Sequence, residues 1–218
     1  MQHIRYKIIQ GDVYRHIWCV GDIHGCYTLL MTGLSELSFD IEQDLLISVG
    51  DNIDRGPESL QVLRLLDTPW FESVVGNHEE IALDAFETQD GNLWDRSGGG
   101  WFFNLSAEQQ TEAVKLISRF RSLPHILEIT ADYRKCVIVH ADYPSNTYHF
   151  GKVVDYDDLL WSCNRVQKSL KGEHEVIKGA ETFIFGHITF SEIMSFSNQV
   201  YIDTGAPNSK KLSFYQIK

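Results

Sequence analysis

Five short apolar runs in this chain each end abruptly in a cluster of glycine with aspartate, asparagine or histidine. Runs this short, rich in β-branched and aromatic residues and bounded by glycine, are typical of buried strands. The runs and the polar clusters after them are 16–20 before 21–25, 45–49 before 50–56, 72–75 before 76–79, 136–139 before 140–142, and 183–185 before 186–187. The pattern therefore places five polar loops at the ends of five buried strands.

Amphipathic segments lie between some of these runs. They predict helices over 27–37, 57–66 and 106–120, the last of which opens with Ser106 and Gln109 as a capping box. Strands that alternate with helices favour an α/β fold built on stacked sheets. Because ligands of open α/β sheets gather beyond the carboxyl ends of the strands, we expect the five polar clusters to converge.

The C-terminal part of the sequence has the pattern of three further short strands, over 193–196, 200–203 and 212–217, separated by turns. We expect these strands to complete a second sheet. The 218 residues contain no internal repeat, low-complexity tract or linker, and the length suits one hydrophobic core. We therefore expect a single domain over 1–218.

The charge balance narrows the choice of partners. With 19 basic and 30 acidic side chains the formal net charge is −11, so the long-range field repels a nucleic-acid backbone and we expect no nucleic-acid partner. No segment resembles a signal peptide or a membrane-spanning run, so we expect a cytoplasmic protein without membrane contact. Its four cysteines form no Cys-x-x-Cys pair and do not indicate a disulfide framework.

The five loops offer carboxylate oxygens, an amide oxygen and imidazoles, but no thiolate. The candidate ligands are Asp22, His24, Asp51, Asn77, His140 and His187. This set suits a binuclear site of Mn, Fe or Zn better than a structural zinc site. A carboxylate such as Asp51 can bridge two cations, and a pair of metals can stabilise both the attacking and the leaving oxygen of a phosphoryl transfer.

Each cluster taken alone also has a simpler interpretation. Gly-Asp-x-His-Gly at 21–25 could be a turn with a capping aspartate, and Asn77 could cap a helix. No single structural need explains all five clusters in this order, and this favours the metal site. The other histidines are interpreted as structural or surface residues: His3, His16, His125, His149 and His174.

The polar clusters together resemble the phosphoprotein phosphatase superfamily. The motifs that carry the resemblance are Gly-Asp-Ile-His-Gly at 21–25, Gly-Asp-Asn-Ile-Asp-Arg-Gly at 50–56, Gly-Asn-His-Glu at 76–79, Val-His-Ala-Asp at 139–142 and Gly-His at 186–187. Further stretches at 45–50, 140–144, 150–152, 160–161 and 201–205 are similar to the bacteriophage lambda type and its small enterobacterial relatives. The resemblance runs nearly from end to end.

This resemblance implies a four-layer αββα metallophosphatase sandwich, with a binuclear metal site at the carboxyl ends of the strands. It implies two divalent metal ions, manganese first, with iron, zinc or nickel as substitutes. Asp22, His24 and Asp51 would hold the first ion, and Asp51, Asn77, His140 and His187 the second. A hydroxide bridging the ions would attack phosphorus directly, without a phosphoenzyme.

The resemblance also assigns catalytic roles to three residues. His78 would protonate the leaving oxygen, Asp54 would orient the imidazole of His78, and Arg55 would grip phosphate oxygens through its planar fork. The substrates implied are phosphoproteins carrying phosphoserine, phosphothreonine and often phosphotyrosine. The chain would be a serine/threonine-type protein phosphatase, a phosphoric monoester hydrolase.

The sequence departs from the family pattern in two places. Cys163 stands where related chains commonly have a phosphate-binding arginine, and Arg165 follows two residues later. On one helix, two residues turn a side chain through roughly 200°, so Arg165 is not expected to replace that arginine. The second departure is Gly-His-Ile-Thr at 186–189, where the family usually has Gly-His-Thr-Pro, so the contacts that support His187 are expected to differ.

Two other functions stay open on the sequence. A symmetrical dinucleoside tetraphosphate hydrolase shares the same metal loops, although such chains are longer and the stretch 140–144 favours the phosphatase branch. A non-catalytic phosphoprotein-binding module could have kept the fold and lost turnover. Retention of His78, Asp54 and every expected metal ligand argues against that module.

Overall fold

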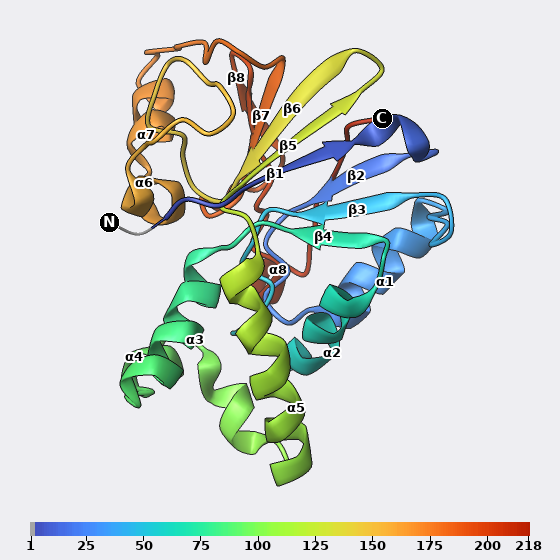
Figure 1. Ribbon diagram of the computed structural model, residues 1–218, viewed down its shortest axis with the longest axis vertical. Coiled ribbons are helices and arrows are strands. Elements are labelled where there is room, and N and C mark those ends of the chain that lie inside the picture. The colour runs from blue at the N-terminus through green and yellow to red at the C-terminus, as the bar shows by residue number, and fades with distance from the viewer. Residues whose placement is uncertain (1–2) are drawn as a thin grey trace.

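Two β-sheets stacked face to face form the centre of the computed structural model, which describes residues 3–218 (Figure 1). The six-stranded sheet has the order β1 (Tyr6–Gln10), β5 (Ile126–Ala131), β6 (Arg134–Val139), β7 (Thr182–Phe185), β9 (Gln199–Tyr201) and β8 (Met194–Phe196). The four-stranded sheet has the order β10 (Phe214–Gln216), β2 (Ile17–Val20), β3 (Leu45–Ser48) and β4 (Phe71–Ser73).

The helices lie outside the two sheets (Figure 1). Their bounds are α1 (Tyr27–Glu36), α2 (Ser59–Arg64), α3 (Asn77–Thr88), α4 (Asn92–Arg96), α5 (Ala107–Ile117), α6 (Tyr156–Trp161), α7 (Asn164–Leu170) and α8 (Ala206–Ser209). Short 3₁₀ helices at 11–13, 65–67, 99–104 and 118–122 extend or connect them. Among residues 3–218, no helix combines the length and the apolar character needed to cross a membrane.

Three apolar clusters hold the layers together. Alternate strand residues of both sheets, such as Ile47 and Ile138, form a core between the sheets. Leu46 of β3 faces the other way and packs with residues of α1 and α2. Phe183 of β7 packs on the opposite outer face with residues of α6 and α7. These clusters confirm the expected four layers, in which two stacked sheets are covered by helices on both outer faces.

Strand direction places the polar loops at one edge of the sandwich. β2, β3 and β4 run parallel, with Ile17 beside Leu45, and β6, β7 and β9 run parallel in the other sheet. The five apolar runs of the sequence correspond to β2, β3, β4, β6 and β7. Their carboxyl ends therefore open toward a common region, as the sequence predicted.

A separate helical layer lies below this edge in Figure 1. The helices α3, α4 and α5 and the 3₁₀ helix at 99–104 form a fourth apolar cluster around Trp94, Phe102 and Phe120. Ile53 and Leu60 join this cluster from the loop after β3 and from α2. The loop after β3, which carries Asp54 and Arg55, is thus packed directly against the helical layer.

The predicted elements agree with the structure in part. The helices expected over 27–37 and 106–120 are found as α1 and α5, and the capping box of Ser106 and Gln109 is present. The expectation that the last three strands complete one second sheet is wrong. β8 and β9 extend the six-stranded sheet, whereas β10 pairs antiparallel with β2 in the other. The register of these strands depends on partners far away in the sequence.

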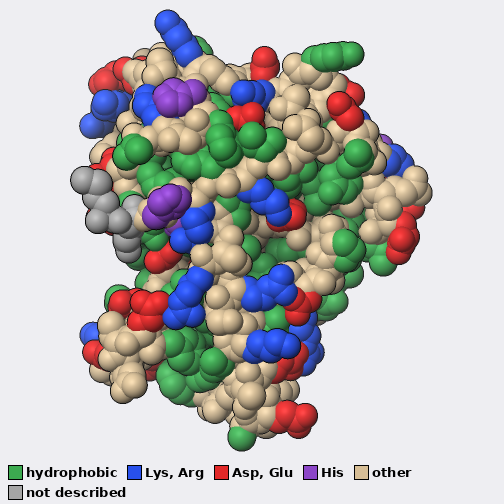
Figure 2. All heavy atoms as spheres, in the orientation of Figure 1, with side chains coloured by type: hydrophobic (Ala, Val, Ile, Leu, Met, Phe, Trp, Pro, Cys, Tyr) green, Lys and Arg blue, Asp and Glu red, His purple; other side chains and the backbone are tan. Residues whose placement is uncertain are grey.

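Charged side chains of both signs are mixed on the face that Figure 2 shows. Some of them form ion pairs between elements, such as Lys7 of β1 with Glu72 of β4 at 2.6 Å and Arg64 of α2 with Glu112 of α5 at 2.7 Å. Exposed pairs of this kind contribute little to stability, because solvent screens their charges. The buried apolar clusters therefore determine the fold.

Candidate metal centre and active site

Backbone hydrogen bonds tie the polar loops to one another. The N–H of His24 donates to the carbonyl of Asp51 at 2.9 Å, and the N–H of Gly25 donates to the carbonyl of Asn52 at 2.8 Å. Within the six-stranded sheet, the N–H of Gly186 after β7 donates to the carbonyl of His140 after β6 at 2.8 Å. The convergence expected from the strand pattern is therefore real, and each loop fixes the position of its neighbour.

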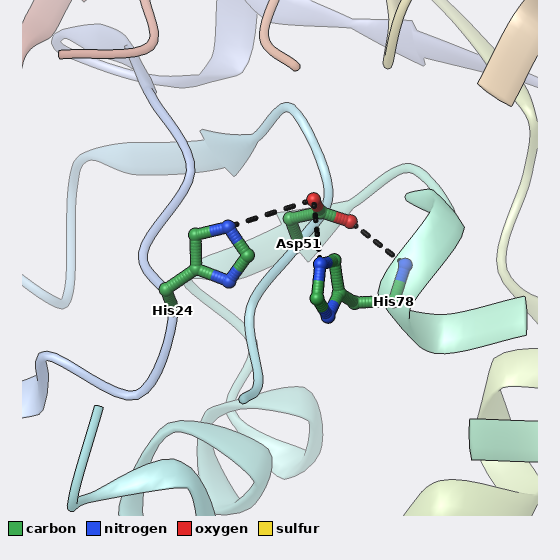
Figure 3. Close-up of side chains that lie close together, drawn as sticks. All are labelled: His24, Asp51 and His78. Atoms are coloured by element: carbon green, nitrogen blue, oxygen red, sulfur yellow. Dashed lines mark hydrogen bonds and ion pairs between the residues drawn. The ribbon is translucent and has the colours of Figure 1, made fainter. Parts of the chain in front are cut away.

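Asp51 lies at the centre of the converging side chains. Its Oδ2 is 3.6 Å from His24 Nε2, and its Oδ1 is 3.5 Å from His140 Nε2. The backbone N–H of His78 donates to Oδ1 at 3.0 Å, so the N-terminus of α3 also faces this carboxylate. Figure 3 shows the rings of His24 and His78 on two sides of the Asp51 carboxylate.

Two groups of side chains could each hold a metal ion, and they share Asp51. The first contains His24, Asp51 and His78, and the second contains Asp51, His140 and His187, with ligand atoms within 4.8 Å of one another in each group. A carboxylate common to two groups is the arrangement of a bridging ligand. His78 occupies a place in the first group, where the sequence interpretation put Asp22.

Asp22 and Asn77 also reach this centre. The N–H of His187 donates to both oxygens of Asp22, at 3.2 and 3.1 Å. The Oδ1 of Asn77 lies 2.8 Å from His140 Nε2 and 3.1 Å from His187 Nδ1. All six predicted ligands are therefore brought together, although the ligand role of each stays a prediction.

The electrostatics of the centre fit divalent cations. Burial, together with the charges of Asp203 and Asp51, raises the pKa of Asp22 well above its ordinary value. Burial lowers the pKa values of His24 and His187 to about 4, so both imidazoles are neutral near pH 7. Neutral imidazoles beside buried carboxylates are what a metal ion needs, since it binds deprotonated ligands and offsets their excess negative charge.

The backbone is held in the left-handed region at five of the candidate residues. The φ angles are 44° at His24, 51° at Asp51, 74° at Asp54, 66° at Arg55 and 63° at His187. Residues with a Cβ pay roughly 1–2 kcal/mol for this conformation, and such residues cluster at functional sites. The hydrogen bonds between the loops offset this cost and fix the direction of each side chain.

His78, Asp54 and Arg55 form a contiguous group beside Asp51. The Nδ1 of His78 is 2.8 Å from Asp54 Oδ2. The two terminal nitrogens of Arg55 lie 2.8 Å from the Nε2 atoms of His24 and His78. Burial lowers the pKa of His78, but the charge of Asp51 and the hydrogen bond and charge of Asp54 outweigh it, so the pKa lies above its ordinary value. A raised pKa suits a proton donor.

Sequence reasoning missed two buried acids that support the loops. Glu79 accepts hydrogen bonds at 2.8 Å from the backbone N–H groups of Asp51, Asn52 and Gly76. Asp203, which follows β9, accepts one at 2.6 Å from the Thr189 hydroxyl. The signal for Asp203 was available, because Val200 to Asp203 repeats the pattern of a short apolar run ending in an acid.

The region of Cys163 differs from the expectation in one respect. Cys163 and Arg165 do not lie within one helix, because Cys163 is the N-cap of α7 and only Arg165 lies inside that helix. Arg165 donates to the carboxylate of Asp142 at 3.2 Å and to the carbonyl of Tyr143 at 3.0 Å. Its guanidinium is thus engaged in the loop after β6, so Arg165 does not take the place of the missing arginine.

The histidines interpreted as structural or surface residues lie outside the metal centre. His125 is fully buried, and its Nδ1 accepts a hydrogen bond from the backbone N–H of Arg5 at 2.9 Å. His3, His149 and His174 are exposed and His16 is half-buried.

The comparison of the sequence with known families agrees with this geometry. The model of the calcineurin-like phosphoesterases matches residues 15–189. This chain belongs to that family. The match spans every predicted ligand and catalytic residue, and the expected metallophosphatase resemblance is confirmed.

Relatives of this phosphoesterase cover its whole length. It is 61% identical over 218 residues to serine/threonine-protein phosphatase 2 of Escherichia coli strain K12, covering 100% of both chains. It is 46% identical to serine/threonine-protein phosphatase 1 of Salmonella typhimurium, covering 98% of this chain and 97% of that one. The fold also matches the crystal structure of a putative diadenosine tetraphosphatase, with a TM-score of 0.70, 23% identity, and coverage of 99% and 94%.

Proposed function

We propose that this phosphoesterase is a metal-dependent phosphoprotein phosphatase that hydrolyses phosphoserine and phosphothreonine. The observation that carries the proposal is the sharing of Asp51 by two ligand groups, with the His78–Asp54 pair directly beside it. The likeness to serine/threonine phosphatases over the full length supports the same substrate class.

Two divalent ions, manganese first, fit the six predicted ligands and would supply an activated water and charge neutralisation at the phosphate. The residues of the chain then have separate tasks. Arg55 is an exposed residue at the edge of the centre, and its terminal nitrogens, which contact His24 and His78 in this structure, would turn to the phosphate oxygens and bind them in a bidentate manner. His78 would give its Nε2 proton to the seryl or threonyl oxygen as the bond to phosphorus breaks, while Asp54 holds Nδ1.

A hollow lies beside the metal centre. Its volume is about 450 Å³, and its lining includes His24 and Arg55 together with Thr189, Asp203 and Lys211. The larger pocket, of about 790 Å³ beside Tyr6 and Phe150, shares no residue with the candidate site. We place the residues next to the phosphorylated side chain in the smaller hollow, because it opens directly onto Arg55.

The test is phosphate release from a phosphoserine peptide by EDTA-stripped protein, before and after manganese is added, with Asp51→Asn as the control. We expect turnover that needs manganese and is lost in the variant. Release from a symmetrical dinucleoside tetraphosphate but not from the peptide would instead favour the hydrolase that shares these loops. Peptide binding without any release by metal-replete protein would favour the binding module.

A further inference from the structure

The carboxylate of Asp54 is fully buried and has more partners than the orientation of His78 requires. Its Oδ2 contacts His78 Nδ1 at 2.8 Å, and its Oδ1 accepts hydrogen bonds from two indole N–H groups. Trp94 of α4 donates at 2.9 Å and Trp101 of the 3₁₀ helix at 99–104 donates at 2.8 Å. A buried charge is stable only when it is paired or hydrogen-bonded, and the two indoles meet that need.

The two tryptophans are themselves fixed in place. Trp94 is 1% exposed and packs against Phe86 and Phe102, with ring centroids 5.4 and 5.3 Å apart. Trp101 meets Trp94 edge to face at 6.0 Å. Rings held on several sides have few alternative rotamers, so their N–H groups present a rigid pair of donors to Asp54.

The glycines between the two tryptophans permit this approach. A Cβ on Gly99 would lie 2.5 Å from Cδ1 of Trp94, and a Cβ on Gly98 would lie 2.7 Å from the backbone nitrogen of Arg55. Gly98 has a φ of +108°, and its carbonyl accepts the N–H of Arg55 at 3.1 Å. The segment 94–101 therefore forms hydrogen bonds with both Asp54 and Arg55, two residues whose backbone is left-handed.

We propose that Trp94 and Trp101 are positioning residues for leaving-group protonation, acting on Asp54 and through it on His78. This inference rests on the proposed phosphatase function and assigns a part in it to the helical layer. Without the indole donors, Asp54 can rotate about its side-chain bonds, and the imidazole of His78 loses its fixed direction. A purely structural role would hold the helical layer against the sheets without affecting any one step of the reaction.

The first experiment compares leaving groups. Trp94→Phe and Trp101→Phe keep an aromatic ring and remove the N–H. We expect kcat for a phosphoserine peptide to fall about tenfold in each, with KM and manganese content unchanged, and kcat for p-nitrophenyl phosphate to fall less than about threefold. An aryl oxide leaves without protonation, so only the alkyl ester depends on the orientation of His78.

The matched control is Trp18→Phe. The indole nitrogen of Trp18 is buried and makes no hydrogen bond within residues 3–218, so this variant removes an N–H without removing a bond. We expect no change of kcat on either substrate. In a His78→Asn background, the two tryptophan variants should change kcat by less than about twofold, because the group they position is gone. Equal losses on both substrates, or losses that persist in that background, would overturn the proposal.

A second measurement does not depend on activity. In the nitrogen–proton spectrum of the protein loaded with zinc, which is diamagnetic, Asp54→Asn should move two of the five indole N–H resonances, those of Trp94 and Trp101, and leave the other three in place. Unchanged indole resonances would overturn the proposed contact. If the wild-type protein does not release phosphate from the peptide, the proposed function fails, while this spectrum still tests the contact.

Discussion

The Nδ1 atom of His78 lies 2.8 Å from Oδ2 of Asp54, while the backbone N–H of the same histidine donates to Asp51. His78, the second residue of α3, is thus joined both to the proton-donor pair and to the centre of the metal site. Because these two roles meet in one residue, His78 is the sharpest target for mutation.

Replacing His78 by asparagine separates acid catalysis from metal binding. We expect His78→Asn to lower kcat for an alkyl phosphate by about 100-fold or more, since a positioned general acid contributes about 10²–10⁴-fold. Manganese content, measured by elemental analysis after dialysis, should stay near that of the wild type. A marked loss of manganese would instead make His78 a ligand, as its place beside His24 and Asp51 allows.

Replacing Asp51 by asparagine should empty the centre. Asp51 belongs to both ligand groups, so the loss of its charge weakens both sites at once. We expect Asp51→Asn to retain no manganese after dialysis against buffer without metal, while its circular dichroism stays that of the wild type. Near-normal manganese in this variant would contradict the bridging role.

Arg55 should affect substrate affinity more than metal binding. Lysine cannot reproduce the planar, bidentate donor fork of arginine. We expect Arg55→Lys to raise KM for a phosphopeptide about tenfold with unchanged manganese content. Arg64→Lys is the control, because Arg64 pairs with Glu112 on the exposed surface of α2 and should leave KM unaltered. A KM equal to that of the wild type would remove Arg55 from phosphate binding.

Glu79 should stabilise the loops that carry the ligands. Its carboxylate accepts hydrogen bonds from three backbone N–H groups. The amide of glutamine would place its own NH₂ donor against one of these N–H groups, so that hydrogen bond would be lost. We expect Glu79→Gln to lower the free energy of unfolding by about 2 kcal/mol, as found when buried backbone donors lose their partner. Glu87→Gln, on the exposed part of the same helix, is the control for urea unfolding. Equal stability of the two variants would contradict this support.

His125 should make the stability of the metal-free protein depend on pH. Burial lowers its pKa, so below pH about 6.5 the unfolded chain takes up a proton that the folded protein does not. The free energy of unfolding should therefore fall as pH decreases through this range and toward the lower pKa of the folded state, and should not depend on His125 at higher pH.

The variant His125→Asn isolates this contribution. Asparagine can still accept the N–H of Arg5, which His125 Nδ1 accepts in the native protein, but it does not titrate. Urea unfolding of both proteins between about pH 5 and 8 should show a steeper loss with acid for the wild type. Parallel curves would show that His125 contributes nothing to the acid sensitivity.

The sequence by itself determined the strands that carry the site. The runs ending at Val20, Val49, Val75, Val139 and Phe185 are short and apolar, and the residues after them are polar and glycine-rich, so local pattern alone fixes which side chains follow a strand. In parallel sheets those positions share one edge, so the sequence alone groups Asp22, Asp51 and His140.

Only the tertiary structure decided the contacts made between distant segments. Three examples are the division of β9 and β10 between two sheets, the hydrogen bond from the backbone of Asp51 to Glu79, and the hydrogen bonds from the indoles of Trp94 and Trp101 to Asp54. Each joins residues whose pairing leaves no periodic signal in the sequence. Hydrogen bonds of this kind depend on how layers pack, and packing is settled by the burial of apolar surface over the whole chain.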